Sequence, residues 1–294
     1  MKVLIFGSSG FLGNSLCNVL KENGVEFYTV SRSDSKSSYN IDISDIKQFS
    51  QLPHNFFDVV VNCATILPGG SFLDNNYLEK IYKTNILGSQ NICIWINGQE
   101  SVKKIINCST LVVVNKPWPL QLSEDEATYP TGNHVLYSSS KLTQELIFKT
   151  FAESHNISLT QIRFSALYGE KMNWSGVICD IIDQAKKNKK IILKNGSKVT
   201  ADFLYVDDAA KIIFSSIKHS SEGIINGASG KETSILKLAM IIREYFNGEV
   251  EVENYDDPDF TESRSLINID KLEKIIQTNT FMDLRNGIKK VIEQ

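Results

Sequence analysis

The chain opens with a short apolar run, a glycine turn and an amphipathic helix, in that order. Val3–Phe6 has the continuous apolar character of a buried parallel strand, and the run stops at Gly7. From Phe11 onward, apolar side chains recur at helical spacing. A strand, a turn and a helix in this order direct the free N–H groups and the positive dipole end of the helix at one point. Such a point suits a pyrophosphate, so the opening predicts a dinucleotide site on a sheet of parallel strands.

The glycines follow the spacing G-x-x-G-x-x-G, which differs from the commoner G-x-G-x-x-G fingerprint. Gly7 permits the tight turn, Gly10 lets a phosphate approach the backbone, and Gly13 lets the helix pack closely on the strand. A purely structural turn is the alternative, since surface turns also produce glycine triplets. The residues that we expect to contact the dinucleotide here are Gly7, Ser9, Gly10, Phe11, Leu12 and Gly13.

The charge balance argues against nucleic acid and membrane surfaces as partners. The 294 residues carry 31 Lys and Arg against 34 Asp and Glu, a formal net charge of −3, so no basic field draws the chain to polyanions. No apolar stretch of the sequence reaches membrane-spanning length, and the apolar run at the start is too short for a signal peptide. We therefore expect a cytoplasmic protein that acts on a small molecule.

The cysteines are scattered through apolar segments, with no C-x-x-C pair and no His/Cys ligand spacing. This pattern is typical of reduced, buried thiols in a cytoplasm, and it predicts no metal site. The five residues are Cys17, Cys63, Cys93, Cys108 and Cys179.

Strand and helix patterns alternate through about residue 165, which predicts the α/β class with a doubly wound parallel sheet. Beyond that point the pattern is irregular and predicts a smaller, mixed α/β substrate lobe. We divide the chain into a dinucleotide-binding domain, residues 1–165, and a C-terminal lobe, residues 166–294, of which about 203–226 could return to the main sheet. Expected helices include 74–95, 135–154 and 269–276, and residues 115–133, with three prolines, are expected to form a surface loop.

The residues that would select the cofactor follow the second expected strand, 25–30. An acidic residue here would bind a ribose 2′-hydroxyl, whereas Arg32 and its neighbours Ser31 and Ser33 can hold a 2′-phosphate. We therefore expect NADP in preference to NAD, with an exposed arginine on a polar loop as the alternative interpretation. Asp42 and Ile43 fall where a third short strand would end, within reach of an adenine amino group. Asp42 could equally cap the next helix, as could Ser44.

Small residues end the strand expected over 57–62 and would let a cofactor lie against the backbone. These are Cys63, Ala64 and Thr65. Asn85 lies in the middle of the helix expected over 74–95, where its propensity is poor. Its position indicates a buried hydrogen-bonding role behind a site, with an exposed side chain as the alternative.

Tyr137 and Lys141 lie four positions apart in the helix expected over 135–154, so the phenol and the ammonium share one face. A free phenol titrates near pH ~10. A charged lysine about 4 Å away stabilises the phenolate by roughly 4 kcal/mol at an effective dielectric of about 20, or about three pK units. Tyr137 would then titrate near pH ~7, which suits a general acid or base. Thr110, at the end of the strand expected over 104–109, would hold the substrate oxygen; a purely structural helix face is the alternative.

Seven short motifs occur in one order along the chain. They are Gly7-x-x-Gly10-x-x-Gly13, Asp58-Val-Val-Val-Asn-Cys-Ala64, Asn85-Ile-Leu-Gly88, Cys108-Ser-Thr110, Tyr137-x-x-x-Lys141, Arg163-x-x-x-x-Tyr168-Gly169 and Tyr205-Val-Asp-Asp208. Over essentially its whole length the chain resembles the extended short-chain dehydrogenases/reductases, the NAD-dependent epimerase/dehydratase family. The resemblance implies a Rossmann-type fold, hydride exchange with a nicotinamide cofactor and, usually, a nucleotide-linked sugar as substrate.

The resemblance also implies roles for single residues. Thr110, Tyr137 and Lys141 match the catalytic triad of the family. Lys141 would also bind the nicotinamide ribose, so that Tyr137 and Lys141 count among the cofactor contacts. Asn85 matches a position that braces the site.

Departures from the family pattern bear on the substrate. Family dehydratases place Asp-Glu directly after the catalytic Thr, where this chain has Leu111-Val112, so it has no evident acid/base pair for eliminating water. Ala166 stands where many members have an Asn that touches the sugar nucleotide, and Ala201 where an Arg often clamps the diphosphate. Losing a bidentate Arg removes a strong phosphate contact. Ser165, by contrast, resembles the 4-keto-sugar reductase branch of the family.

We therefore expect an enzyme that reduces the 4-keto group of a nucleotide-linked deoxy sugar with NADPH, with Tyr137 as general acid/base. A nucleotide-sugar epimerase with tightly held NAD is the alternative, and a cofactor-binding regulator that has lost catalysis is a further one. The helices expected over 74–95 and 135–154 have extensive apolar faces, and the matching helices of the family often form a dimer interface. We expect a homodimer, with burial of these faces inside one chain as the alternative.

Overall fold

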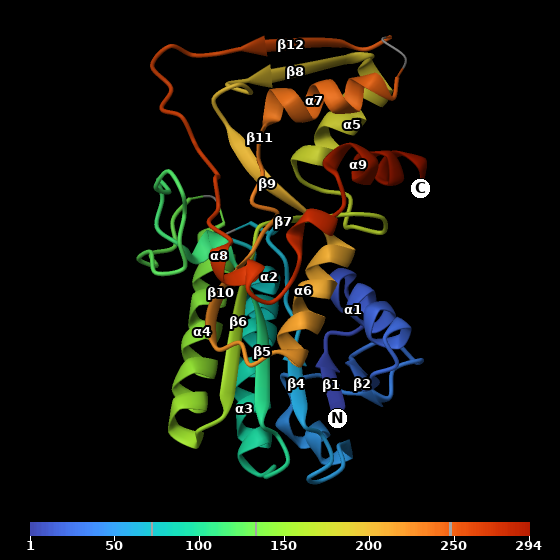
Figure 1. Cartoon of the computed structure of the whole chain (residues 1–294), viewed down its shortest axis with the longest axis vertical. Helices are drawn as coiled ribbons and strands as arrows, with labels where there is room; N and C mark the ends of the chain where they lie inside the picture. Colours follow the sequence, from blue (N-terminus) through green and yellow to red (C-terminus); the bar gives the residue numbers. More distant parts are fainter. Residues whose placement is uncertain (72, 133, 247–248) are drawn as a thin grey trace.

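The computed structural model describes residues 1–71, 73–132, 134–246 and 249–294. One parallel sheet holds seven strands: β1 (Lys2–Phe6), β2 (Glu26–Ser31), β3 (Tyr39–Asn40), β4 (Val59–Asn62), β5 (Lys104–Thr110), β6 (Ser158–Phe164) and β10 (Gly223–Gly227). Their order across the sheet is β10-β6-β5-β4-β1-β2-β3, and each paired neighbour is parallel (Figure 1). This is the doubly wound, Rossmann-type α/β fold that the alternating strands and helices predict.

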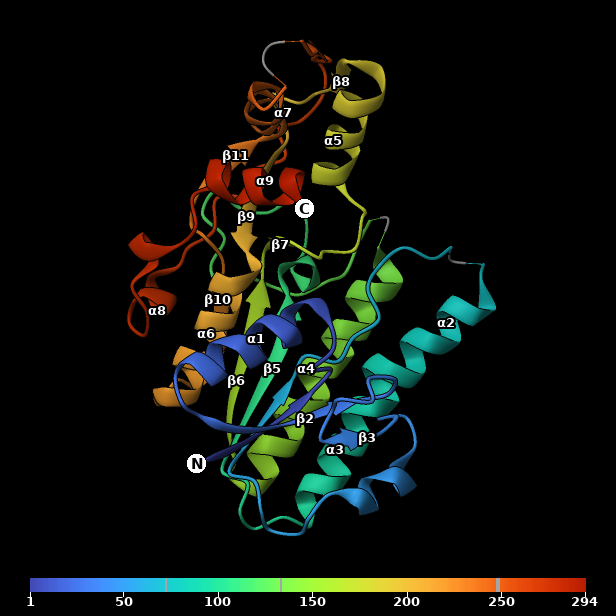
Figure 2. The same ribbon diagram turned by 90° about the vertical axis from the view of Figure 1, so that its right-hand side faces the viewer.

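Helices cover both faces of this sheet (Figures 1 and 2). On one face lie α1 (Phe11–Glu22) and α6 (Val206–Lys218), and on the other α3 (Gly88–Asn97) and α4 (Val135–His155). The side chains of β1 alternate accordingly: Val3 packs with α1 and α6, whereas Leu4 packs with α3 and its neighbours. Burial on both faces is why the central strands are apolar throughout.

The helix expected over 74–95 is interrupted. It consists of α2 (Asn75–Ile81), a π-helical turn η2 (Tyr82–Leu87) and then α3. A π-helical turn changes the direction of its side chains relative to a regular helix. Here the turn contains Asn85, whose side chain is fully buried.

Two other element boundaries differ from expectation. The third strand ends at Asn40, two residues before the predicted end at Asp42. The helix expected over 269–276 is limited to α8 (Asp270–Glu273). Ile275 and Ile276 are β-branched, which lowers helix propensity, and both pack on the core beneath α6.

The strands outside the main sheet lie beyond the carboxyl ends of the main strands (Figure 1). A three-stranded sheet contains β7 (Ala166–Tyr168), β9 (Thr200–Tyr205) and β11 (Glu232–Ser234), and β8 (Lys190–Lys194) pairs with β12 (Glu251–Tyr255). The helices α5 (Val177–Asn188), α7 (Ile235–Glu244) and α9 (Leu284–Glu293) share a core with these strands. β10 returns to the main sheet beside β6, whereas β9 stays in the smaller sheet. The division between residues 1–165 and 166–294 stays a prediction.

The loop expected over 115–133 is described through residue 132. In residues 115–132 the chain forms only single β-bridges, at Leu122 and Thr128. Residue 133 lies outside the described residues.

Two observations bear on the partner and thiol predictions. All five cysteines lie in the described part of the chain, and none of them forms a disulfide. Cys93, Cys108 and Cys179 are buried, whereas Cys17 and Cys63 are half-buried.

Among the helices described, none combines the length and the apolar character needed to cross a bilayer.

A buried ion pair joins three elements of the main layer. Arg163 of β6 donates from Nε and Nη2 to the two carboxylate oxygens of Glu145 on α4, at 3.0 and 2.8 Å. Ser109 of β5 donates to the same carboxylate at 2.5 Å. The Arg163 and Glu145 side chains are only 3% and 4% exposed, so neither charge has water as an alternative partner.

Removing one charge of this pair leaves the other buried without compensation. We expect Glu145→Gln to lower the free energy of unfolding by about 3–5 kcal/mol, measured by urea denaturation. The matched control is Glu153→Gln on the same helix. Its carboxylate is 68% exposed and lies 3.9 Å from Lys149, so little change is expected. Equal stability of the two variants would contradict the argument.

Candidate active site

The turn after β1 holds two glycines against backbone atoms. Gly7 has a φ of 77°, and a Cβ there would lie 2.5 Å from the backbone nitrogen of Ala64, at the end of β4. A Cβ on Gly13 would lie 2.2 Å from the carbonyl oxygen of Gly7. Real Cβ atoms essentially never come this close, so any side chain at either position would displace α1 or β4.

The same turn provides an anion cradle. Gly10 is the N-cap of α1, and among the described residues no side chain caps this helix. The first N–H groups of a helix have no partner within it, so those that follow Gly10 remain available together with the positive dipole end. The Gly10 backbone itself is open, because a Cβ there would meet only the Gly7 oxygen, at 3.3 Å. A pyrophosphate fits these donors.

A groove follows the carboxyl ends of β1, β2 and β4 away from this turn. Nine of the predicted cofactor contacts line it: Gly7, Ser9, Gly10, Arg32, Asp42, Ile43, Cys63, Ala64 and Thr65. Six others do not line it, namely Phe11, Leu12, Gly13, Asn85, Tyr137 and Lys141. Ser31 and Ser33, which flank Arg32, also line it, as do four residues that the sequence did not indicate, Val30, Ile41, Ile66 and Thr84. Most of these are immediate neighbours of predicted residues, so a window around each strand end would have found them.

The end of the groove near β2 is built from serines and one arginine. Ser31 shares a hydrogen bond of 2.7 Å with Ser9, and its hydroxyl accepts the backbone N–H of Ser33 at 3.4 Å. Arg32 is exposed at the groove wall. The arrangement leaves the guanidinium available to a phosphate, which the expectation of NADP requires.

Asp42 lines the groove and also forms a local turn. Its carboxylate accepts the backbone N–H of Ser44 at 2.9 Å and the Ser44 hydroxyl at 2.7 Å. The N-cap of the next helix, η1 (Ile46–Gln51), is Asp45, so the alternative that Asp42 or Ser44 caps this helix is wrong.

Thr110, Tyr137 and Lys141 gather at the carboxyl end of β5. Thr110 is the last residue of β5, and Tyr137 and Lys141 lie in the first two turns of α4. Burial raises the pKa of the Tyr137 phenol well above its ordinary range, while hydrogen bonding with Thr110 and with Thr65 opposes this shift. The structure thus brings together Thr110, Tyr137 and Thr65, the last of which also lines the groove.

The expectation that Lys141 brings the pKa of Tyr137 toward neutrality is wrong for this arrangement. The Lys141 ammonium donates to the Cys108 carbonyl at 2.6 Å and to Oε1 of Gln144. Burial lowers the pKa of Lys141 to about 8, although the nearby Cys108 and Glu145 act in the opposite direction and raise it. The i, i+4 spacing places both side chains on one face of α4, but two carbonyl acceptors hold the ammonium at the floor of the site.

Asn85 is fully buried, so the exposed alternative is wrong. Its side-chain oxygen accepts the backbone N–H of Ile66 at 2.7 Å and the Thr65 hydroxyl at 3.3 Å. Its side-chain nitrogen donates to Ser140 on α4 at 2.9 Å. The π-helical turn therefore joins the segment after β4 to the helix that carries Tyr137.

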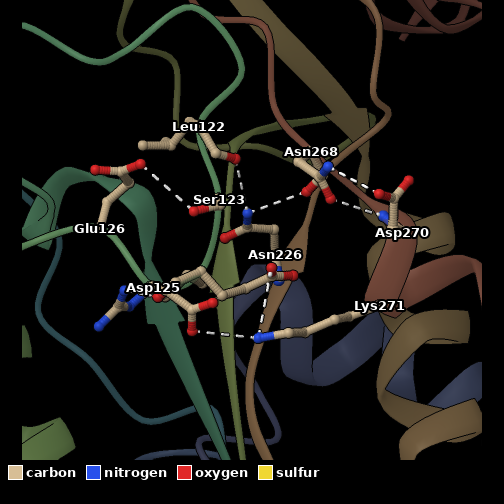
Figure 3. Close-up of polar contacts among 10 residues, drawn as sticks. Leu122, Ser123, Asp125, Glu126, Asn226, Asn268, Asp270 and Lys271 are labelled. Atoms are coloured by element: carbon tan, nitrogen blue, oxygen red, sulfur yellow. Dashed lines mark hydrogen bonds and ion pairs between the residues drawn. The ribbon is translucent and has the colours of Figure 1, made fainter.

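The loop between Thr110 and Tyr137 is fastened to the C-terminal segment by buried polar groups (Figure 3). Asn226 of β10 donates to the carbonyl oxygens of Leu122 and Asn268, both at 3.1 Å. The buried Glu124 carboxylate accepts the Asn226 backbone N–H at 3.1 Å and lies 3.7 Å from Lys271. A residue of β10 and the segment around residues 268–271 therefore hold the loop that precedes α4.

The positions that depart from the family pattern lie near the start of the smaller sheet. Ser165 donates to Asp202 at 2.7 Å, and the same carboxylate accepts two hydrogen bonds from Ser229 at 2.9 Å. Burial raises the pKa of Asp202. Ser165 therefore connects β6 to β9 within the protein. Ala166 and Ala201 bring no donor to this region.

The model of the NAD dependent epimerase/dehydratase family matches residues 3–228. The chain belongs to this family. The resemblance seen in the motifs is thereby confirmed, and the chain is an enzyme that uses a nicotinamide dinucleotide. Among the described residues, no three His, Cys, Asp or Glu side chains are placed to hold a metal ion.

Two curated relatives cover almost the whole chain. A putative UDP-glucose 4-epimerase from Methanocaldococcus jannaschii is 28% identical over 99% of this chain and 97% of that protein. UDP-glucuronic acid decarboxylase 5 from Arabidopsis thaliana is 23% identical over 99% of this chain and 92% of that protein. The solved structure of UDP-glucuronic acid 4-epimerase from Bacillus cereus in complex with NAD has a TM-score of 0.81 at 20% identity, covering 100% of this chain and 98% of that one. The structural likeness shows the fold.

The contact between Gly13 and Gly7 yields a test of the cradle. We expect Gly13→Ala to weaken dinucleotide binding by at least about tenfold, because the added methyl group displaces α1 from the turn. Calorimetric titration with NAD and with NADP measures this. Gly98→Ala is the control, since its Cβ would meet only the Trp95 oxygen at an ordinary 3.7 Å. Wild-type affinity in Gly13→Ala would show that the dinucleotide binds elsewhere.

Proposed function

We propose that this chain is a nucleotide-sugar epimerase that inverts C4 of a UDP-linked hexose through a keto intermediate, with NAD as cofactor. The single observation that carries the proposal is the buried Tyr137 phenol, held with Thr110 and Thr65 beside the groove. Inversion through a ketone needs one group that removes a proton as the phenolate and returns it as the phenol, and Tyr137 is the group proposed for both steps. Full-length similarity to the putative UDP-glucose 4-epimerase of M. jannaschii supports the same class of reaction.

The residues after Thr110 support epimerisation over dehydration. Leu111 is buried and Val112 half-buried, at the positions where family dehydratases carry Asp and Glu. An elimination of water needs a base at carbon and an acid at the leaving hydroxyl, and two apolar side chains supply neither. One phenol suffices for a reaction that moves one proton and one hydride in each direction.

Each residue of the site has a stated task in this proposal. A bound nicotinamide would supply the hydride acceptor and donor. Tyr137 takes the proton of the sugar hydroxyl as the C4–H bond breaks, and it returns the proton when the ketone is reduced on its other face. Thr110 positions the sugar oxygen, Lys141 holds the nicotinamide ribose, and Asn85 fixes the segment after β4 against α4.

The raised pKa of Tyr137 keeps the phenol protonated at neutral pH. In this form it can donate a proton to a ketone oxygen but cannot remove one from an alcohol. The oxidative half of an epimerisation therefore requires the Lys141 ammonium to stabilise the phenolate. Because burial lowers the pKa of Lys141 to about 8, this stabilisation is lost as the pH rises through about 8, and activity in that direction should fall there.

The proposal predicts interconversion without net cofactor turnover. Wild-type protein incubated with NAD and either UDP-glucose or UDP-glucuronic acid should form the C4 epimer. Chromatography of the sugar nucleotides measures this conversion. We expect Tyr137→Phe to lower kcat by about 10²–10⁴-fold with unchanged dinucleotide affinity. Thr143→Val, on the same helix, should leave both unchanged. A kcat for Tyr137→Phe within a few-fold of wild type would remove the phenol from the mechanism.

A second candidate is an NADPH-dependent reductase of a 4-keto sugar nucleotide, and Arg32 favours it. An exposed guanidinium between two serines at the ribose end of the groove suits a 2′-phosphate. In the experiment above, this enzyme would leave UDP-hexoses unchanged and would oxidise NADPH when given a 4-keto sugar nucleotide. It would also release an exchangeable NADP on purification, whereas the epimerase would retain NAD.

We further propose that the enzyme is a homodimer through α3 and α4. Ile94 on α3 and Leu146 on α4 are 53% and 55% exposed on two helices that pack together (Figure 2). Large apolar side chains exposed on adjacent helices suit a four-helix interface between two copies.

The dimer predicts a change of mass in solution. We expect Ile94→Asp with Leu146→Asp to convert a dimer to a monomer in size-exclusion chromatography with light scattering, because the interface would bury two carboxylates. Met240→Asp on α7 is the control, since this side chain is 40% exposed in the other lobe. A wild-type monomer at micromolar concentration would rule out the proposal.

A further inference from the structure

Lys141 is the buried cation of the site, and its partners are neutral. Its side chain is 2% exposed, and its ammonium donates to the Cys108 carbonyl and to Oε1 of Gln144. A buried ammonium without a bonded carboxylate depends on such dipoles for its charge. Cys108 contributes a main-chain group that no substitution removes. Gln144 contributes a side chain about one turn beyond Lys141 and two turns beyond Tyr137 on α4.

The side-chain nitrogen of Gln144 is also held by hydrogen bonds. Its nitrogen donates to the Ser89 hydroxyl at 2.8 Å and to the Asn85 carbonyl at 3.3 Å. The Ser89 hydroxyl in turn donates to the Asn85 carbonyl at 2.8 Å. With its N–H groups directed at two oxygens of η2 and α3, the amide can present only its oxygen to Lys141.

Filling space in the protein core does not by itself account for the hydrogen bonds of Gln144. Gln144 is fully buried, and a buried amide is costly unless its donors and acceptor are all satisfied, whereas an aliphatic side chain would fill the same space without that requirement. The hydrogen bonds of Gln144 instead form one chain, from the π-helical turn through the amide to the ammonium. Asn85, at the start of this chain, also binds Thr65 at the groove.

We infer that Gln144 is a positioning residue that fixes the Lys141 ammonium at the carboxyl end of β5 and stabilises its charged form. The inference rests on the role of Lys141 in the proposed function and names the side chain that sets this role. Gln144 touches neither the groove nor the reacting groups. It acts through Lys141, by holding the ammonium where a ribose hydroxyl or the phenolate can reach it.

The charged and titratable groups around Lys141 come from four elements. Cys108 of β5 and Glu145 of α4 favour its charged form, and Cys63 after β4 does so more weakly. Tyr137 lies one turn away on α4, and Arg163 of β6 is held behind Glu145. Burial outweighs these effects and lowers the pKa of Lys141 to about 8, so the loss of one further acceptor should move its titration into the neutral range.

The test titrates Lys141 directly in the whole protein. Lysines are labelled with carbon-13 at Cε, the Lys141 signal is assigned with Lys141→Met, and its shift is followed against pH in wild type, Gln144→Met and Gln144→Glu. A hydrogen bond to a charged group corresponds to about one pK unit or more, so Gln144→Met should lower the midpoint by about one unit. Gln144→Glu should raise it by a similar amount, because it places a carboxylate beside the ammonium.

Two further variants keep the test decisive. Ser89→Ala removes one anchor of the amide without touching Lys141, so it should shift the midpoint in the same direction as Gln144→Met but less. It serves in place of Gln144→Met if that variant does not fold. Gln90→Met, at an exposed neighbouring position on α3, should have no effect. Equal midpoints in wild type, Gln144→Met, Ser89→Ala and Gln144→Glu would overturn the inference and leave Gln144 a space-filling residue.

The titration does not depend on the substrate. If the midpoints move as expected while no nucleotide sugar is converted, the proposed function is wrong. The inference that Gln144 positions Lys141 is then still supported. If both hold, the basic limb of the pH–rate profile should shift in parallel with the midpoint. Gln144→Met should also weaken dinucleotide binding at pH 8 by about fivefold while leaving it near wild type at pH 6.

Discussion

The close backbone contacts of Gly7 with Ala64 and of Gly13 with Gly7 constrain the rest of the molecule. A methyl group at Gly13 would come within 2.2 Å of the Gly7 oxygen, and one at Gly7 within 2.5 Å of the Ala64 nitrogen. Contacts this short fix the start of α1 against β1 and β4 together. The end of β4 is also where Cys63, Ala64 and Thr65 line the groove, so one packing constraint sets both the helix dipole and the wall that the cofactor would lie against. A substitution here changes the binding site and the fold in the same step.

Parallel pairing then determines which side chains can meet. Because all strands of the main sheet point the same way, their carboxyl ends lie at one edge, where Gly7, Thr65 and Thr110 follow β1, β4 and β5. α4 crosses this edge with its first two turns and contributes Tyr137 and Lys141. The helix is held there by Glu145, which takes hydrogen bonds from β5 and β6, and by Asn85, which bonds to Ser140. The site therefore forms where the strand ends lie next to α4, and buried polar groups hold these elements in position.

The sequence predicted the parts of this arrangement that depend on spacing. Strands such as 3–6 and 104–109 were found because a strand buried on both faces is apolar throughout, and the glycine turn because only glycine tolerates its contacts. The short strands β7 and β11 have three residues each, too few to show a period. The π-helical turn at Asn85 looks in sequence like an ordinary helix. Spacing placed Tyr137 and Lys141 on one face but could not show where the ammonium points, because that depends on the Cys108 carbonyl and Gln144. The expected direction of the Tyr137 pKa was wrong because burial raises it, and the spacing of the two residues does not show how deeply the phenol lies.

The polar groups behind the site explain how the two parts of the chain act as one. Glu124 and Leu122, in the loop before α4, bind Asn226 of β10, and Asn226 also binds the carbonyl of Asn268 in the C-terminal segment. The Arg163 guanidinium donates to the Glu124 carbonyl at 3.3 Å and also to the Glu145 carboxylate on α4. A continuous set of buried hydrogen bonds thus runs from residues 268–271 to the helix that carries Tyr137. Buried networks of this kind are costly when incomplete, so they favour one relative position of the parts that they join. The loop before α4, the edge strand β10 and the C-terminal segment should consequently move together.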